Sequence, residues 1–211
     1  AEAIDDFPVL VLPAVWTGYS PTHMAYPGTV TLRYHTFVDV LTDIAVSVHK
    51  HGFKNIFFLN GHGGNDFLVN SMRIKLATED GVPSTVGYTW WNFPSVLEEM
   101  ERVCESDKDC APRVGERDTS VIGHAGEREM SVQLYLQPEL VDRDAAAWVK
   151  GVWGDPAAGT REKGERIVNA AVEALIKILR DYHSGRLEDG LIRGGGHRGD
   201  VFEGDKKVGR Q

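Results

Sequence analysis

Residues 60–65 read Asn-Gly-His-Gly-Gly-Asn and place one imidazole, that of His62, on a loop with almost no other side chains. The loop directly follows the apolar segment 55–59. A neutral imidazole among small neighbours suits a divalent metal ion, because the glycines leave room for the ion and its water. A phosphate site is one alternative, although the loop lacks the lysine and hydroxyl of a P-loop. A tight turn with an incidental histidine is the other.

A second cluster of titratable groups lies in residues 123–131 (GHAGEREMS), where His124, Glu127 and Glu129 fall close together. A histidine can move a proton near neutral pH, and a carboxylate can bind a metal or orient a water. The alternative is structural, because acidic residues in the first turn of a helix favour its macrodipole. Spacing alone does not choose between Glu127 and Glu129 as the site carboxylate.

Residues 16–32 contain Gly18, Ser20, Pro21, Pro27 and Gly28 and are expected to form a loop. Ser20 and His23 could present polar groups to a ligand from this loop, or His23 could be a buried residue that pins the loop by hydrogen bonds. Trp90 and Trp91 end an expected strand. Either they line a pocket, or they belong to the core or to a subunit contact.

The elements that must position these residues alternate between two kinds of segment. Short apolar segments rich in branched and aromatic residues predict strands at 7–13, 55–60 and 83–91. Apolar residues at three- and four-residue spacing predict helices at 34–51, ended by Gly52, and at 65–79, with Phe67, Leu68, Ser71, Met72 and Leu76 on one face. This alternation predicts a single-domain α/β fold with a doubly wound, mostly parallel sheet. Ligands in such sheets lie beyond the carboxyl ends of the strands, where 60–65 and 90–92 fall.

The second half of the chain is expected to be mainly helical. Residues 123–136 fit both strand alternation and helical spacing, and we favour the helix. Residues 161–183 form a clear amphipathic pattern and predict a closing helix. We therefore expect an α/β domain over 1–184. The glycine-rich, charged segment 185–211 is expected to be a tail or an interface strap.

Composition excludes several classes of protein. The 211 residues carry a formal net charge of -8, which argues against a nucleic-acid partner. No segment has the apolar length of a membrane span and the start of the sequence shows no basic, apolar leader pattern, so we expect a cytoplasmic protein without a membrane partner. The cysteines, Cys104 and Cys110, are expected to be two free thiols in preference to a disulfide.

Taken together, these stretches resemble the creatininase (creatinine amidohydrolase) family. The residues that carry the resemblance follow one another in the family's order over residues 7–182, in the segments 9–32, 60–65, 123–131 and 151–164. The resemblance implies an α/β hydrolase that acts on amide bonds of a small-molecule substrate. It also implies two adjacent divalent metal ions (Zn, Mn or Fe) in each subunit and a homo-hexamer.

The resemblance also implies roles for single residues. His62 matches a metal ligand, and His124 matches the histidine that passes a proton to the leaving nitrogen. Glu129 matches a carboxylate near the metals. The candidate substrate contacts are Ser20, Gly63 and Trp90.

Two departures from the family pattern bear on function. Gly64 stands where the creatinine-hydrolysing members carry a glutamate, so creatinine itself is not the expected substrate. The family's opening E-x-H-G…D metal motif does not occur in the sequence, so we expect a protein beginning at Ala1 to bind metal weakly and to be inactive. A non-catalytic assembly or binding subunit that has lost its metal site is therefore the alternative function, and a phosphate-binding module is a third.

Overall fold

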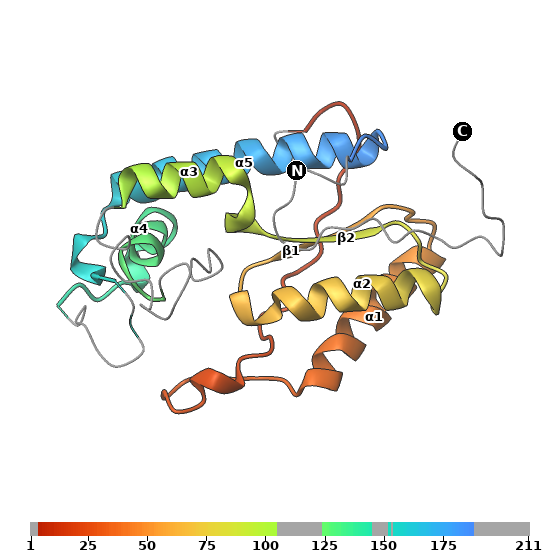
Figure 1. Cartoon of the computed structure of the whole chain (residues 1–211), viewed down its shortest axis with the longest axis horizontal. Helices are drawn as coiled ribbons and strands as arrows, with labels where there is room; N and C mark the ends of the chain where they lie inside the picture. The colour runs from red at the N-terminus through yellow and green to blue at the C-terminus, as the bar shows by residue number, and fades with distance from the viewer. Residues whose placement is uncertain (1–3, 105–123, 145–151, 153, 188–211) are drawn as a thin grey trace, which may run out of the picture. The chain divides into compact units, whose positions relative to one another are not determined.

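The computed structural model describes residues 4–104, 124–144, 152 and 154–187 (Figure 1). The chain divides into two compact units. The first, here called the sheet unit, comprises 1–92 and 178–211, and the second, the α4 unit, comprises 93–177. Cys110 and the tail from 188 onward lie outside the described residues, so the predictions about the cysteines and the tail stay predictions.

The sheet unit is built on two parallel strands, β1 (Ile56–Asn60) and β2 (Thr85–Thr89). Their register pairs the first residue of β1 with that of β2 and Asn60 with Thr89, so both strands end at the same edge. The helix α2 (Asp66–Thr78) connects them, as a parallel pair requires. The predicted strands at 55–60 and 83–91 are confirmed, and the protein has the expected α/β fold.

The helices α1 (Tyr34–Lys50) and α2 lie together on one side of the two strands (Figure 1). Their apolar residues form one core cluster, comprising Phe37, Leu41, Ala45, Leu68, Val69, Met72, Leu76 and Val82. Both predicted helices are confirmed, and Gly52 adopts a φ of +97° just beyond α1. The prediction that Phe67 shares a face with Leu68 and Met72 is wrong, because α2 buries Leu68 and Met72 and leaves Phe67 72% exposed.

The end of α5 (Arg161–His183) contacts the strands through Tyr182. The phenol oxygen of Tyr182 accepts a hydrogen bond from Ile56 N at 3.1 Å and donates one to Ser84 O at 2.7 Å. The ring of Phe57 lies against Tyr182 and stacks on Tyr88, with centroid distances of 6.3 and 5.3 Å. The predicted closing helix is therefore confirmed, and its last turns pack on the sheet.

The predicted strand at 7–13 is wrong. The segment has no strand pairing, and Leu10 and Val11 are 72% and 76% exposed. A strand forms only where a neighbour offers its backbone N–H and C=O groups, and β1 and β2 pair with each other in the sheet that the described residues form. After this segment, Gly18 and Thr31 form a single isolated parallel β-bridge.

The α4 unit contains α3 (Pro94–Val103), α4 (Glu127–Leu136) and the first turns of α5. The helix favoured for 123–136 is confirmed. Its buried residues include Ser131 and Leu134, and Ile167 of α5 is fully buried in the same unit. None of the helices in the described parts of the chain has the length and apolar content needed to cross a membrane.

Candidate functional site

Three loops meet at the edge of the sheet where β1 and β2 end. Asn60, the last residue of β1, donates a hydrogen bond from Nδ2 to Thr89 Oγ1 of β2 at 2.8 Å. The loop before α1 joins them through Tyr19, whose N–H donates to Asn65 Oδ1 at 2.9 Å. Gly63 lies beside the Trp91 ring, since a Cβ at position 63 would be 3.7 Å from Trp91 Cζ2. The expected meeting of 60–65 and 90–92 is confirmed.

The backbone of His62 is held on both sides. His62 is extended (φ −140°, ψ 127°) and precedes the 3₁₀ turn Gly63–Asn65. Its N–H donates to Asn60 Oδ1 at 3.1 Å, and its carbonyl accepts from Asn60 Nδ2 at 2.8 Å. The carbonyl also accepts from Asn65 N at 3.0 Å. The glycine-rich loop therefore has a defined conformation at its histidine.

The imidazole of His62 is half-buried and lies edge-to-face against the ring of His23, with a centroid distance of 5.8 Å. Gly64 makes this placement possible. A Cβ at position 64 would be 2.6 Å from His62 Nε2 and 2.9 Å from Tyr19 O, so any side chain there would displace the ring or the loop. The glycine that departs from the creatinine-hydrolysing pattern thus determines the local geometry.

Ser20 and His23 lie on the neighbouring loop, which contains the 3₁₀ turn Pro21–His23. Ser20 Oγ and His23 Nδ1 share a hydrogen bond of 2.7 Å. Ser20 N donates to Thr31 Oγ1 at 2.8 Å, and Thr29 Oγ1 donates to His23 O at 2.8 Å. His23 is half-buried and not fully buried, and these contacts support the interpretation in which it pins the loop by hydrogen bonds. Through its bond to His23, whose ring lies against His62, Ser20 is linked to the His62 loop.

Trp90 begins the 3₁₀ turn Trp90–Asn92 directly after β2. Its ring is half-buried and lies edge-to-face against Trp91 at 5.5 Å between centroids. Of the two tryptophans it is Trp91 that lies beside Gly63. A substrate contact by Trp90 stays a prediction.

The described residues do not by themselves form a metal centre. Among them, no three His, Cys, Asp or Glu side chains lie close enough together to hold an ion. In the sheet unit, the imidazoles of His62 and His23 lie edge-to-face at this edge of the sheet. The role of His62 as a metal ligand therefore stays a prediction.

His124 and Glu129 belong to the α4 unit. His124 is half-buried, and Glu129, in the first turn of α4, is exposed. The carboxylate of Glu129 accepts a hydrogen bond from the backbone N–H of Ala125. Ala125 has a φ of +54°, an uncommon conformation for a residue other than glycine. Glu129 thus fixes the backbone immediately after His124.

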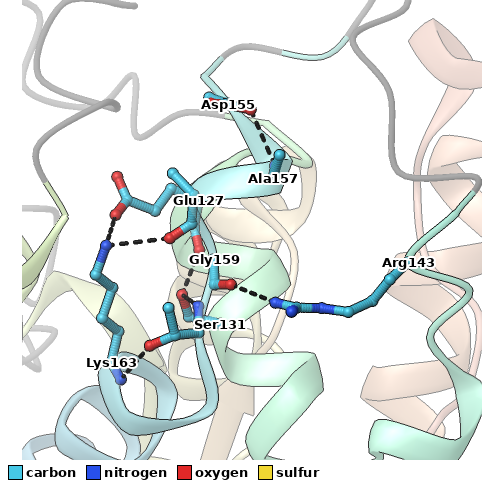
Figure 2. Close-up of polar contacts among 9 residues, drawn as sticks. Glu127, Ser131, Arg143, Asp155, Ala157, Gly159 and Lys163 are labelled. Carbon is cyan, nitrogen blue, oxygen red and sulfur yellow. Dashed lines mark hydrogen bonds and ion pairs between the residues drawn. The ribbon is translucent and has the colours of Figure 1, made fainter.

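The neighbouring carboxylate, Glu127, has a different environment (Figure 2). Its side chain is 1% exposed and forms an ion pair with Lys163, whose Nζ also donates to Ala158 O at 3.1 Å. Ser131 Oγ donates to the carbonyl of Glu127 at 2.6 Å and accepts from Thr160 N at 3.1 Å. Glu127 is therefore part of the packing between α4 and α5, which favours Glu129 as the carboxylate of a site.

Sequence reasoning missed the polar residues that hold His62. Asn60 and Asn65 flank the histidine in the sequence, and asparagine side chains in turns commonly hydrogen-bond to nearby backbone. Their role in holding the loop could therefore have been predicted from the sequence. The hydrogen bond from Thr89 to Asp66 could not have been predicted from the sequence, because threonine is common in strands and aspartate is common at the start of a helix.

Comparison with known proteins agrees with the fold and the motifs. Residues 1–179 match the family model of creatininase, described as creatinine amidohydrolase. The chain is 29% identical over 207 residues to 3-dehydro-scyllo-inosose hydrolase of Thermotoga maritima, covering 79% of this chain and 63% of that protein. It is 24% identical to creatinine amidohydrolase of Pseudomonas putida, covering 82% of this chain and 74% of the relative. It is 25% identical to the mycofactocin precursor peptide peptidase of Mycolicibacterium smegmatis, with 89% and 72% covered.

Solved structures show the same fold. A crystal structure of creatinine amidohydrolase has a TM-score of 0.63 at 24% identity and covers 81% of this chain and 74% of that one. A manganese creatininase has a TM-score of 0.58 at 22% identity, with 78% and 72% covered. The family model spans most of the sequence, and the chain therefore belongs to the creatinine amidohydrolase (creatininase) family.

Proposed function

We propose that this chain is a hydrolase that cleaves an amide-type C–N bond of a small molecule, with a divalent metal ion as cofactor. The observation that carries the proposal is the defined placement of His62. It stands at the carboxyl edge of two parallel strands, where ligands of α/β sheets bind, on the loop that matches the family's motif.

The relatives support a class of reaction and leave the substrate open. By their names they are an inosose hydrolase, a creatinine amidohydrolase and a peptide peptidase, so hydrolysis is shared and the substrate differs. The chain spans 63% of the length of the inosose hydrolase. Gly64 argues against creatinine, because the resemblance places a glutamate at this position in the creatinine-hydrolysing members, and this loop has no space for a side chain between His62 Nε2 and Tyr19 O.

Support for the metal comes from the neighbours and from the ligand chemistry. One neighbour is a manganese creatininase and another is a creatininase mutant of Zn-Zn type. Imidazole nitrogen is a good ligand for both ions. Within the chain, His62 is the proposed ligand, with Glu129 as a further candidate from the α4 unit.

The proton chemistry is assigned to His124. An amide nitrogen is a poor leaving group and needs a proton, which an imidazole supplies near neutral pH. His124 is half-buried, and the Glu129 contact at Ala125 holds its loop. Ser20, Gly63 and Trp90 remain the proposed substrate contacts.

The test is metal analysis combined with a substrate panel. The protein expressed from its intact gene, which need not begin at Ala1, is stripped with a chelator, reloaded with Zn, Mn or Fe, and assayed against lactams, formamides, short amides and creatinine. We expect a metal-dependent rate on at least one amide other than creatinine. A protein that binds metal in stoichiometric amounts but hydrolyses nothing would contradict the proposed activity, and one that binds no metal would favour the non-catalytic subunit.

The proposal retains the expectation of a cytoplasmic homo-oligomer, a hexamer by family resemblance. The exposed residues Leu10, Val11 and Trp16 support self-association, since uncovered apolar side chains of this size commonly mark a protein contact. Light scattering on the purified protein measures the number of subunits, and a monomer would contradict the oligomer.

A further inference from the structure

The last residues of β1 and β2 form a polar chain with the start of α2. Asn60 Nδ2 donates to Thr89 Oγ1 at 2.8 Å, and Thr89 Oγ1 donates to the carboxylate of Asp66. Asn60 and Thr89 are only 6% and 2% exposed. Water has little access to these two groups, so their orientation depends on their protein partners.

The chemistry of Asp66 fixes the direction of this chain. An ionised carboxylate accepts hydrogen bonds and donates none, and a hydroxyl has a single proton. The Thr89 proton is therefore committed to Asp66, and Thr89 can only accept from Asn60. Asn60 must in turn present its NH₂ group, and not its oxygen, to Thr89.

The same orientation of the Asn60 amide allows both of its hydrogen bonds to the backbone of His62. With its NH₂ toward Thr89, the Asn60 amide also donates to His62 O at 2.8 Å, and its oxygen accepts from His62 N at 3.1 Å. A flipped amide would set NH₂ against the N–H of His62 and oxygen against its carbonyl. Both contacts would then be repulsive.

We propose that Thr89 and Asp66 are positioning residues, which hold the backbone of His62, and with it the base of its imidazole side chain, by selecting the orientation of the Asn60 side chain. The catalytic consequence rests on the proposed function. The structural effect does not, because the hydrogen bonds exist whether or not His62 binds metal. Thr89 and Asp66 act through Asn60 and are not assigned contact with substrate.

The test compares Thr89→Val with Thr89→Ser in the full chain labelled with ¹⁵N. Valine keeps the shape of threonine and removes the hydroxyl, whereas serine keeps the hydroxyl. One lost hydrogen bond of ordinary strength predicts that exchange of the His62 amide proton becomes roughly 5–10-fold faster in Thr89→Val. Thr89→Ser should restore the slow exchange, and the nuclear Overhauser contact between the His62 and His23 rings should weaken only in Thr89→Val.

Asp66→Asn gives an independent variant if Thr89→Val fails to fold. An asparagine at 66 can also donate to Thr89, which frees the threonine proton to turn toward Asn60, so faster His62 exchange is expected again. Asp43→Asn, on the exposed surface of α1, controls for the loss of one charge.

Two outcomes would overturn the inference. One is unchanged His62 exchange in a folded Thr89→Val or Asp66→Asn protein. The other is a Thr89→Ser protein that behaves like Thr89→Val, which would point to packing of the methyl group. Hydrolysis is measured separately, so a protein without activity would count against the proposed function while the exchange result still tests the orientation of Asn60.

Discussion

The carbonyl oxygen of Ser131 on α4 lies 1.9 Å from the point at which a side chain at position 164 of α5 would begin. The two helices therefore cross with backbone in contact with backbone, and Gly164 is what permits it. The same close approach lets Ser131 Oγ accept the hydrogen bond from Thr160 N at the start of α5. The packing of α4 against α5 thus depends on a residue that contributes no side chain.

Gly164→Ala should destabilise the protein, because neither neighbouring backbone can move without breaking these contacts. Overpacking of this kind costs roughly 1–3 kcal/mol, measured as the free energy of unfolding in urea. Gly61→Ala is the control, since nothing lies within 4 Å of its Cβ position and it should change stability by less than about 0.5 kcal/mol. Equal stabilities for the two variants would show that α4 and α5 are not in this contact in solution.

Tyr182→Phe tests the attachment of α5 to the strands. The variant keeps the ring that packs on Phe57 and removes the hydroxyl that contacts Ile56 N and Ser84 O. We expect a loss of about 1–2 kcal/mol in the free energy of unfolding, which is the usual effect of removing one partner of a partly buried hydrogen bond. Tyr34→Phe, on an exposed tyrosine, should leave stability unchanged. A Tyr182→Phe protein as stable as the parent would contradict the contact.

Glu127→Gln and Glu129→Gln separate the two carboxylates of α4. Glu127 is buried and paired with Lys163, whose side chain is 30% exposed and can recover part of its solvation, so Glu127→Gln should cost roughly 1–3 kcal/mol of stability. Glu129→Gln keeps an acceptor for Ala125 N and should cost less than about 0.5 kcal/mol, while lowering hydrolysis. The reverse pattern, with activity lost only in a stable Glu127→Gln protein, would make Glu127 the site carboxylate.

Much of the fold could be predicted from local sequence patterns. The predictions that were wrong, for residues 7–13 and for Phe67, have the same kind of cause. Residues 55–60 and 7–13 carry the same apolar signal, yet only the first forms a strand, because it has β2 beside it. An apolar pattern reports a preference for burial and does not report whether a hydrogen-bonding neighbour exists. The prediction for Phe67 was wrong for a similar reason. Apolar residues lie on two adjacent faces of α2, and only the face with Leu68 and Met72 is buried in the packing.

The candidate site was predictable in position and not in detail. The order strand, glycine loop, helix placed His62 at the carboxyl edge of the sheet, and the structure confirms that position. The Asn60–Thr89 hydrogen bond joins residues 29 apart and depends on the register of β1 with β2. Register follows from the packing of the whole sheet, so no local pattern in the sequence could have identified Thr89.

In the protein expressed from its intact gene, His62→Ala should lower bound metal and abolish hydrolysis while leaving the fold intact, because the side chain lies on a loop and is not part of the core cluster. The measurements are metal content by elemental analysis, rate on the active amide, and circular dichroism. His35→Ala, an exposed histidine of α1, is the matched control and should keep both metal and activity. Full metal occupancy in His62→Ala would rule out its role as a ligand.

His124→Gln should separate proton transfer from metal binding. Glutamine is polar and of similar size, but it cannot deliver a proton to the leaving nitrogen, so kcat should fall by ~10²–10⁴ while metal content stays at the parent level. The loop should keep its shape, because Glu129 still bonds to the N–H of Ala125. An amide with an activated leaving group, such as an anilide bearing a nitro group, needs less protonation, so its rate should fall less than that of an unactivated amide. Equal losses on both substrates would assign His124 to substrate positioning, and loss of metal in the variant would make it a ligand.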